Sequence, residues 1–188
     1  MTISFGKKIP VATCNIKNST NMQPCHATIF EHDCADISDY EEISNLKGHW
    51  EYKDAIAKEA LKKYEHPISN IGTKIYSIST QTGKTVGLME TCEYNKMCSI
   101  EHLESHYKGL YQGIGTALLS FLAQQKTKQN VSHIFVTNPA KTAKKFYTEH
   151  CFFNKTDTIA LELNREGMTK LIAKHEDKTK SPIINLKG

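Results

Sequence analysis

The feature of this sequence that most constrains its fold is a pair of glycines at the start of an amphipathic helix. Gly113 and Gly115 open a run at 113–125 whose apolar residues recur at helical intervals, namely Ile114, Leu118, Phe121 and Leu122. Because glycine has no Cβ atom, such a backbone can turn tightly and let an anion approach. The unpaired N–H groups of the first helical turn then point at that anion. The run predicts a pyrophosphate-binding loop over Gln112–Gly115.

Two familiar nucleotide-binding loops are excluded by the residues around these glycines. A Rossmann dinucleotide loop would place a third glycine three positions after Gly115, where this chain has Leu118. A P-loop requires the sequence Gly-Lys-Ser/Thr, which does not occur here. The ligand is therefore expected to be a pyrophosphate compound held in another way.

The segments around the loop alternate between strand-like and helix-like patterns. An amphipathic helix is predicted over 50–64, a hairpin over 73–80 and 84–94 with its turn at 81–83, and a third strand over 97–103. A short strand is predicted at 27–30, and the acidic run 36–45 is either a loop or a short helix. After the glycine-headed helix, a strand is predicted at 132–137, a helix at 140–150, and strands at 152–153 and 158–163. This order favours an α/β (α+β) fold with a largely antiparallel central sheet and helices on both faces.

The length of 188 residues suits one domain with less ordered ends. Residues 1–26 are polar and contain Pro10 and Pro24, so they are predicted to be an extension with little core of its own. Residues 27–165 are predicted to form the domain. The charged residues 166–188 are predicted to be a tail with a loose end, with at most a short helix over 168–174.

Several functional classes are disfavoured by composition. No apolar run approaches the roughly 18–20 residues of a membrane span, and residues 1–13 lack the apolar segment of a signal peptide. We therefore expect a cytoplasmic protein without membrane contact, with secretion as an effector left open. A net charge of +4 does not by itself indicate nucleic-acid binding.

The six cysteines contain no Cys-x-x-Cys pair. The cysteines and histidines between Cys14 and Cys34 have spacings that match no common structural zinc site. We expect free thiols and no bound metal.

The glycine loop resembles the acetyl-CoA loop of the GNAT acetyltransferases, whose pattern is Gln/Arg-x-x-Gly-x-Gly/Ala at the start of a helix. Here that register is 110–115, with Leu110 in place of Gln or Arg. The family commonly continues with an Asn after a strand, a helix ending in Phe-Tyr, and Gly-Phe. This chain has Asn138, Phe146-Tyr147 and Cys151-Phe152, so Cys151 replaces the glycine. The resemblance covers about 73–163.

The resemblance implies an acyltransferase that uses acetyl-CoA as co-substrate, whose acceptor amine attacks the thioester directly in a ternary complex. Backbone amides near Leu103–Ser105 would polarise the thioester carbonyl. The acceptor, whether a small molecule, a peptide or a protein, would bind around 50–64 and 151–163. The residues that the resemblance assigns to coenzyme binding are Leu103, Gln112, Gly113, Ile114, Gly115, Thr116, Asn138 and Lys144.

Two catalytic residues are predicted by the same resemblance. Tyr147 is expected to be the general acid for the departing thiolate, because a phenol is uncharged at pH 7 and can donate a proton. Glu101 is expected to be the base, acting through water. The alternatives to Glu101 are His102, Glu104 and Glu90.

Other positions have a structural interpretation beside the functional one. Asn138 either binds the coenzyme arm or caps the next helix. Lys141, Lys144 and Lys145 either contact the coenzyme 3′-phosphate or form a solvated helix face. Residues 106–108, which include Tyr107 and Lys108, lie before the glycines and could contact either substrate; Lys108 or Gln112 could also compensate for Leu110.

Three functional alternatives follow from the residues. The donor loop and the run 152–158 are similar to those of toxin acetyltransferases that modify aminoacyl-tRNA. The polar first residues would suit an effector that acetylates a protein. The departures at Leu110 and Cys151 would suit an acyl-CoA-binding module without catalysis.

Overall fold

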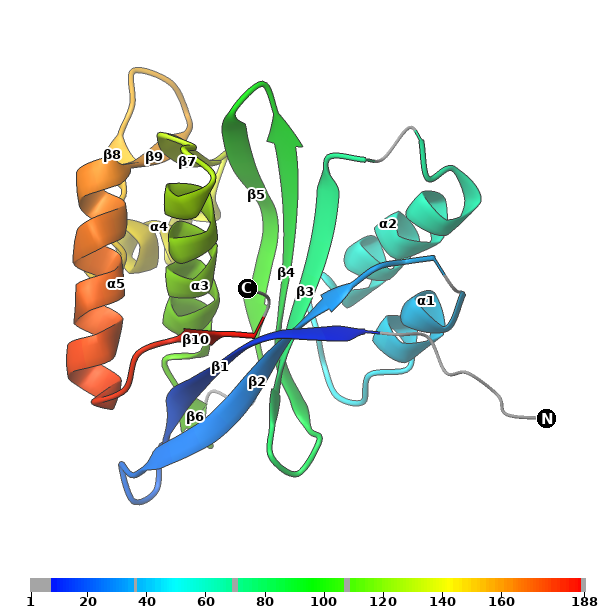
Figure 1. Cartoon of the computed structure of the whole chain (residues 1–188), viewed down its shortest axis with the longest axis horizontal. Helices are drawn as coiled ribbons and strands as arrows, with labels where there is room; N and C mark the ends of the chain where they lie inside the picture. Colours follow the sequence, from blue (N-terminus) through cyan, green and yellow to red (C-terminus); the bar gives the residue numbers. More distant parts are fainter. Residues whose placement is uncertain (1–7, 36, 69–70, 107–108, 187–188) are drawn as a thin grey trace.

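The computed structural model describes residues 8–35, 37–68, 71–106 and 109–186, and these form one twisted sheet with helices on both faces (Figure 1). The strands are β1 (Ile9–Asn18), β2 (Pro24–His32), β3 (Thr73–Thr80), β4 (Thr85–Tyr94), β5 (Met97–Ser105), β6 (Tyr111–Gln112), β7 (His133–Val136), β8 (Asn154–Lys155), β9 (Leu161–Asn164) and β10 (Ile184–Asn185). The helices are α1 (Ile37–Ser44), α2 (Lys53–Glu65), α3 (Ile114–Lys128), α4 (Lys141–Lys145), the π-helical turn η1 (Phe146–His150) and α5 (Arg165–Thr179).

The sheet is largely antiparallel, as the sequence predicts. Its strand order is β10-β1-β2-β3-β4-β5-β7-β9-β8, and β6 pairs with β1. Among these pairings, β5 with β7 is parallel and the others are antiparallel. A parallel neighbour requires a crossover, and α3 supplies it.

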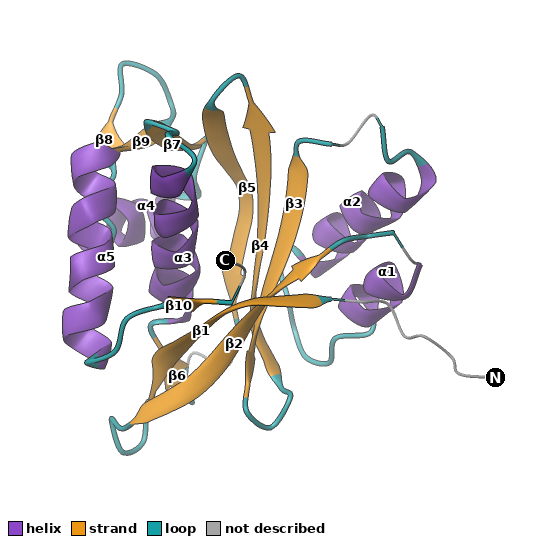
Figure 2. Ribbon diagram, in the orientation of Figure 1, coloured by secondary structure: helices purple, strands orange, loops and turns teal. Residues whose placement is uncertain are grey.

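Helices cover both faces of the sheet (Figure 2), and each face carries its own apolar cluster. Successive residues of a strand point to opposite faces, so Ile75 and Tyr76 of β3 separate. Ile75 joins the cluster beneath α1 and α2, together with Trp50 and Ile56. Tyr76 joins the main cluster with α3 and α5, where its ring meets Phe121 edge to face at 5.3 Å.

Helix α3 is buried nearly all round, because α5 covers the side that the sheet does not. The Ser120 hydroxyl on α3 donates to the Leu171 carbonyl of α5 at 3.4 Å. Even Lys126 is buried, and its ammonium donates to Glu93 at 2.5 Å and to Gln129 at 2.8 Å. These two acceptors satisfy a cation that would otherwise be costly to bury.

The predicted polar extension at the N-terminus is wrong for the described residues from 8 onward. Strand β1 pairs with β2, β6 and β10, and Val11, Cys14 and Ile16 lie in the main core. The polar residues Thr13 and Asn15 lie between these apolar ones, so the average composition of the segment is polar although one face of the strand is not. Pro10 lies at a register shift, where the strand tolerates it.

The predicted loose tail is also wrong as far as residue 186. Helix α5 has 15 residues, and it buries Met168 and Leu171 against the core. The Asn164 side chain caps the helix by accepting from the Gly167 N–H at 2.9 Å. Strand β10 then returns to pair with β1. The predicted strand at 152–153 is likewise absent from the structure, because Phe152 has φ 62° and interrupts the extended chain before β8.

No helix within the described ranges combines the length and the apolar character that crossing a membrane requires.

Candidate active site

The site begins where β5 separates from β7. Their pairing ends at Ile100↔Val136, although β5 continues to Ser105. The register against β4 passes from Thr91↔Ile100 to Glu90↔His102, so Glu101 is the extra residue of a β-bulge. A bulge bends its strand and strengthens the local twist. The backbone of residues 101–105 therefore has no strand partner among the described residues on the side of β7.

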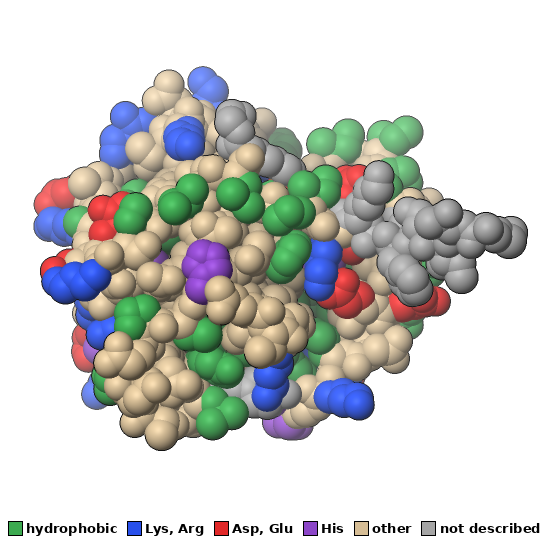
Figure 3. Space-filling model, turned by 60° about the horizontal axis from the view of Figure 1, so that its bottom comes forward, with side chains coloured by type: hydrophobic (Ala, Val, Ile, Leu, Met, Phe, Trp, Pro, Cys, Tyr) green, Lys and Arg blue, Asp and Glu red, His purple; other side chains and the backbone are tan. Residues whose placement is uncertain are grey.

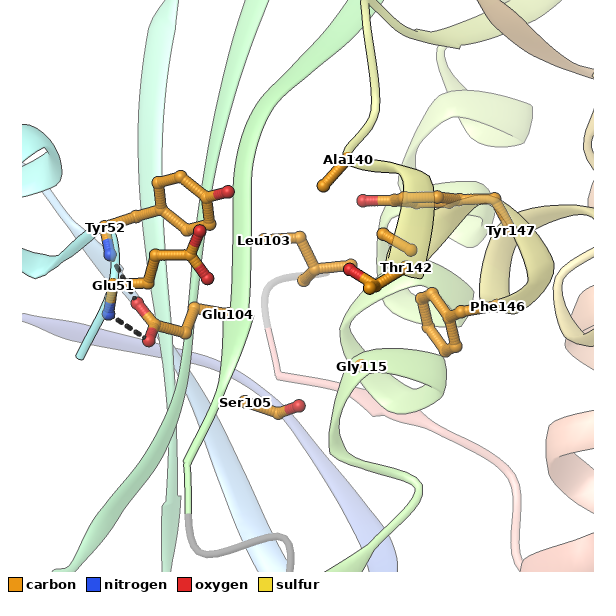
Figure 4. A pocket seen from close by; sticks show the side chains of 11 residues that line it. Glu51, Tyr52, Leu103, Glu104, Ser105, Gly115, Ala140, Thr142, Phe146 and Tyr147 are labelled. Carbon is orange, nitrogen blue, oxygen red and sulfur yellow. Dashed lines mark hydrogen bonds between the residues drawn. The ribbon is translucent and has the colours of Figure 1, made fainter. Parts of the chain in front are cut away.

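A cavity of about 440 Å³ fills the space beside this edge (Figure 4). Leu103, Glu104 and Ser105 of β5 line it on one side, and Phe146 and Tyr147 of η1 line it on the other. Further walls come from Glu51 and Tyr52 before α2, from Gly115 of α3, and from Ala140, Thr142 and Ala143. The cavity is thus bounded by parts of the chain almost 100 residues apart.

Tyr147 is the predicted acid, and its phenol projects into this cavity (Figure 4). The ring is only 6% exposed, and it packs edge to face against Phe146 and Phe153, each at 5.2 Å. No hydrogen-bond partner of the hydroxyl lies among the described residues. Burial raises the pKa of Tyr147 above its ordinary value. The phenol is therefore neutral at physiological pH and free to donate to a bound ligand.

Carboxylates line the opposite wall of the cavity (Figure 4). Glu104 accepts hydrogen bonds from the backbone N–H groups of Glu51 and Tyr52, at 2.5 and 2.8 Å. These bonds fix the chain that enters α2. A hydrogen bond to the Glu51 carboxylate, with burial, raises the pKa of Tyr52. Two carboxylates and a protonated phenol thus face the Tyr147 hydroxyl.

His102 lies just behind this wall. Its Nδ1 is 3.0 Å from Oε2 of the buried Glu90, and its ring lies 5.0 Å from that of Tyr52. The hydrogen bond to Glu90 raises the pKa of His102. Of the predicted alternatives for the base, Glu104 lines the cavity, whereas His102 and Glu90 form a pair outside the lining.

The glycine loop forms a second cavity, of about 230 Å³, next to the first. Gly113 caps α3 with φ 82°, a left-handed conformation that suits glycine. The N–H groups of Ile114, Gly115 and Thr116 belong to the first helical turn, which has no intrahelical partners for them. All three residues line the cavity, as do Gln112 and Gly113. A Cβ at Gly115 would lie 3.0 Å from the Phe146 ring, so a side chain there would crowd the passage between the two cavities.

The structure does not bring three predicted site residues to these two cavities. Glu101 is exposed and accepts a hydrogen bond from Ser99, because the bulge rotates it away. Asn138 is exposed with φ 48°, and it does not cap α4, whose N-cap is Ala140. Lys144 lines a separate cavity near Lys155 and Thr156.

The two departures from the family pattern have structural explanations. Leu110 is 48% exposed, and the contact it makes is through its backbone, since its carbonyl accepts from the Ser19 N–H at 2.8 Å. Cys151 has φ −120°, which any residue adopts, and the left-handed residue is Phe152. Burial raises the pKa of the Cys151 thiol to about 12, so it is a neutral core residue. Tyr107 and Lys108, also considered at the sequence level, lie outside the described residues.

The sequence places the acceptor around 50–64, but it singles out neither Glu51 nor Tyr52 as a site residue. They were assigned to the beginning of an amphipathic helix at residue 50, but α2 begins at Lys53. No capping motif occurs at residues 52–54, so the local sequence does not indicate that the helix begins at Lys53 rather than at residue 50. Their position depends on the long-range bonds to Glu104, which no local pattern shows.

A buried Asp-His-Ser arrangement lies elsewhere, beneath α1. His32 Nδ1 is 2.9 Å from Asp39, and its Nε2 is 2.9 Å from the Ser77 hydroxyl. All three side chains are buried, so no substrate reaches them. Potential ligand atoms of His32, Asp39 and Glu42 lie within 4.8 Å of one another. However, Asp39 also accepts from the Cys34 N–H, and Glu42 pairs with Lys8 at 2.5 Å, so this network is already satisfied without a cation.

Comparisons with known proteins identify the fold. Neither protein-family models nor curated protein sequences give a match. Among solved structures, a GNAT-family acetyltransferase from Staphylococcus aureus Mu50 is similar, with a TM-score of 0.55 and 18% identity over 74% of this chain and 99% of that one. The PaiA N-acetyltransferase of Thermoplasma acidophilum, in complex with coenzyme A, has a TM-score of 0.52 and 15% identity over 72% and 98%. The AtaTR structure bound with acetyl-CoA has a TM-score of 0.56 and 16% identity over 77% and 97%. The chain has the fold of the GNAT acetyltransferases.

Proposed function

We propose that this GNAT-fold chain is an acetyl-CoA-dependent N-acetyltransferase. The observation that carries the proposal is the junction of the two cavities, which share Ser105, Gly115 and Phe146. One cavity offers the N–H groups of a helix start, and the other offers a free phenol opposite two carboxylates. A ligand with a pyrophosphate at one end and a reactive thioester at the other fits this arrangement.

The donor is held mainly by backbone groups. The first-turn N–H groups of α3, at Ile114, Gly115 and Thr116, take the pyrophosphate. The pantetheine arm passes Gly115 and lies along residues 103–105, where β5 has no partner on the side of β7. Free N–H groups of this edge can polarise the thioester carbonyl. The departure at Leu110 is tolerated, because the contacts to phosphate are made by the backbone.

The reaction then needs an amine, a base and an acid. The neutral amine attacks the carbonyl carbon, so a C–N bond forms and the C–S bond breaks. Tyr147 donates its proton to the departing thiolate sulfur. Glu51 receives a proton from the amine, directly or through water, and we assign this role to Glu51 because Glu101 faces away from the cavity. Glu104 positions Glu51 through its backbone N–H.

The negative charge on one wall of the main cavity supports an amine as the acceptor. Glu51 and Glu104 lie on the wall opposite Tyr147, where they attract a cationic amine before it loses its proton. On the face shown in Figure 3, the Lys and Arg side chains stand in several separate places rather than in one continuous patch. That face therefore offers no argument for a nucleic-acid acceptor, and a small-molecule or peptide amine is the acceptor proposed.

Activity with a panel of amines tests the proposal. Purified protein is incubated with acetyl-CoA and individual diamines, polyamines or peptides, and both free thiol and the N-acetyl product are measured, the latter by mass spectrometry. We expect equal amounts of thiol and N-acetyl product, and strong loss of both in Tyr147→Phe. Thiol release without an N-acetyl product, or turnover unchanged in Tyr147→Phe, would contradict the proposed mechanism.

A further inference from the structure

A third cavity, of about 270 Å³, adjoins the glycine loop and shares no lining residue with the main cavity. It shares Gln112, Gly113 and Thr116 with the loop cavity, which in turn shares Gly115 with the main cavity. The loop cavity, at the start of α3, therefore adjoins both of the others. A ligand whose pyrophosphate is held at that start has one end in the main cavity and its other end here.

The N-terminal strand builds one wall of this third cavity and supports the loop at the same time. Lys17 of β1 is opposite Gln112 of β6, and Asn18 is opposite Tyr111. The next residue, Ser19, donates its N–H to the Leu110 carbonyl at 2.8 Å. This pairing fixes the position of the Lys17 side chain relative to the glycines. The end of α5 builds the other wall, through His175, Lys178 and Thr179.

The cavity carries two cations without a counter-ion. Neither Lys17 nor Lys178 has a salt-bridge partner among the described residues. Nearby lysines of α5 and its end differ in this respect, since Lys170 pairs with Glu166 and Lys180 pairs with Asp177. Asp177, whose pKa is lowered mainly by its hydrogen bond to Lys180 and slightly by Lys17, is fully exposed. Two unpaired ammonium groups at one cavity favour an anionic ligand.

A buried polar side chain completes the wall. His175 is 2% exposed, and no described residue supplies a hydrogen-bond partner for its Nε2. Such a group is costly to leave unsatisfied, and a ligand or water can supply the missing bond. Met22 adds an apolar surface on the other side. Cations, a neutral imidazole and an apolar wall suit a phosphorylated nucleoside better than they suit a simple ion.

We propose that this cavity binds the 3′-phosphorylated adenosine end of the acyl-CoA donor, with Lys17 and Lys178 as the phosphate ligands. The inference rests on the proposed function, because it assumes that the donor pyrophosphate lies at the start of α3. It makes β1 and α5 part of the donor site. It also replaces the lysines of α4 as candidates for the 3′-phosphate, since Lys144 and Lys145 line a cavity that shares no residue with the glycine loop.

The test compares acetyl-CoA with 3′-dephospho-acetyl-CoA, two donors that differ in the 3′-phosphate alone. Dissociation constants are measured by calorimetry for the wild type, for Lys17→Gln/Lys178→Gln, and for the control Lys144→Gln/Lys145→Gln, which removes the same charge. Glutamine keeps much of the aliphatic chain, so packing is preserved. Unfolding temperatures establish that all three proteins are folded.

We expect the wild type to bind acetyl-CoA roughly tenfold more tightly than the dephospho donor, since two charge-assisted contacts are lost with the phosphate. The Lys17/Lys178 variant should lose most of this preference while binding the dephospho donor as the wild type does, and the control should keep it. A preference that survives in the Lys17/Lys178 variant, or that disappears in the control, overturns the inference but leaves the acetyltransferase function intact. A wild type that binds neither donor overturns the function and this inference with it.

Discussion

At the scale of residues, the site depends on side chains whose surroundings fix them before any substrate arrives. Tyr147 is held by two aromatic rings, so its hydroxyl reaches the cavity without a large loss of side-chain freedom on binding. Glu104 is held by two backbone N–H groups, and through them it positions Glu51. The proposed acid and the proposed base therefore come from separate elements, and each has its own support.

Replacing Tyr147 with Phe removes the proton donor and keeps the ring packing. We expect kcat to fall by roughly 10²-fold or more, the usual range for loss of a general acid, while the dissociation constant of acetyl-CoA changes little. Steady-state kinetics and calorimetry on the same preparation measure both quantities. A variant that loses acetyl-CoA binding rather than turnover would assign Tyr147 to the donor pocket instead of the chemistry.

Replacing Glu104 with Ala removes the acceptor of two backbone N–H groups. We expect the free energy of unfolding to fall by about 1–3 kcal/mol, because hydrogen bonds to a charged group are lost. Glu101→Ala is the matched control on the same strand, and its exposed side chain should change the free energy much less. Urea denaturation measures both variants. Equal effects would show that Glu104 does not anchor the entry to α2.

At the scale of elements, the sequence predicts best where local pattern and tertiary environment agree. The strand at Thr73–Thr80 and the glycine-headed helix were predicted with nearly the correct bounds. Strand β1 was missed because its apolar positions alternate within a polar segment, and its partners lie as far away as β6 and β10. Glu101 was assigned to the site from the family resemblance, which places a carboxylate on the strand that leads into the loop. A bulge at that residue reverses the alternation, and no local signal marks it.

The C-terminal helix gives a direct test of the corrected architecture. Met168 is fully buried in the main core, whereas Met97 is 48% exposed at the start of β5. We expect Met168→Ala to lower the free energy of unfolding by about 2–5 kcal/mol, the range for buried large-to-small substitutions. Met97→Ala should lower it by much less. A small effect at Met168, measured by chemical denaturation, would mean that the helix is the loose tail that composition suggests.

At the scale of the whole molecule, β1 and α5 connect the stability of the fold to the proposed donor site. His175 is part of both, because it lies in α5 and lines the third cavity. Burial lowers its pKa from 6.5 to about 4. Between these values the unfolded chain binds a proton that the folded chain does not. The contribution of neutral His175 to the free energy of unfolding is therefore complete above pH 6.5 and decreases as the pH falls towards 4.

This linkage predicts a measurable difference between the wild type and His175→Leu. Over the range from pH 7 to pH 4 the wild type should lose roughly 3 kcal/mol more stability than the variant, which corresponds to the shift in pKa. Carboxylates that titrate over the same range affect both proteins, so the difference isolates His175. Denaturation curves at several pH values give the comparison. Parallel stability profiles would contradict a neutral, buried His175.

We propose that the backbone at the start of α3 holds the pyrophosphate of acetyl-CoA, and substitutions of Gly113 test this contact. Among the described residues, its two chain neighbours aside, no atom lies within 4 Å of a Cβ placed at Gly113, and its left-handed φ of 82° is tolerated by Asn and Asp. Gly113→Asn and Gly113→Asp therefore introduce the same shape and differ in one negative charge.

Calorimetric titration of acetyl-CoA into the wild type and the two variants is the measurement. We expect micromolar binding by the wild type, about 8 kcal/mol of binding free energy. We expect at least tenfold weaker binding by Gly113→Asp than by Gly113→Asn, because the carboxylate repels the pyrophosphate. Equal affinities of the two folded variants, or no binding by the wild type, would contradict the claim.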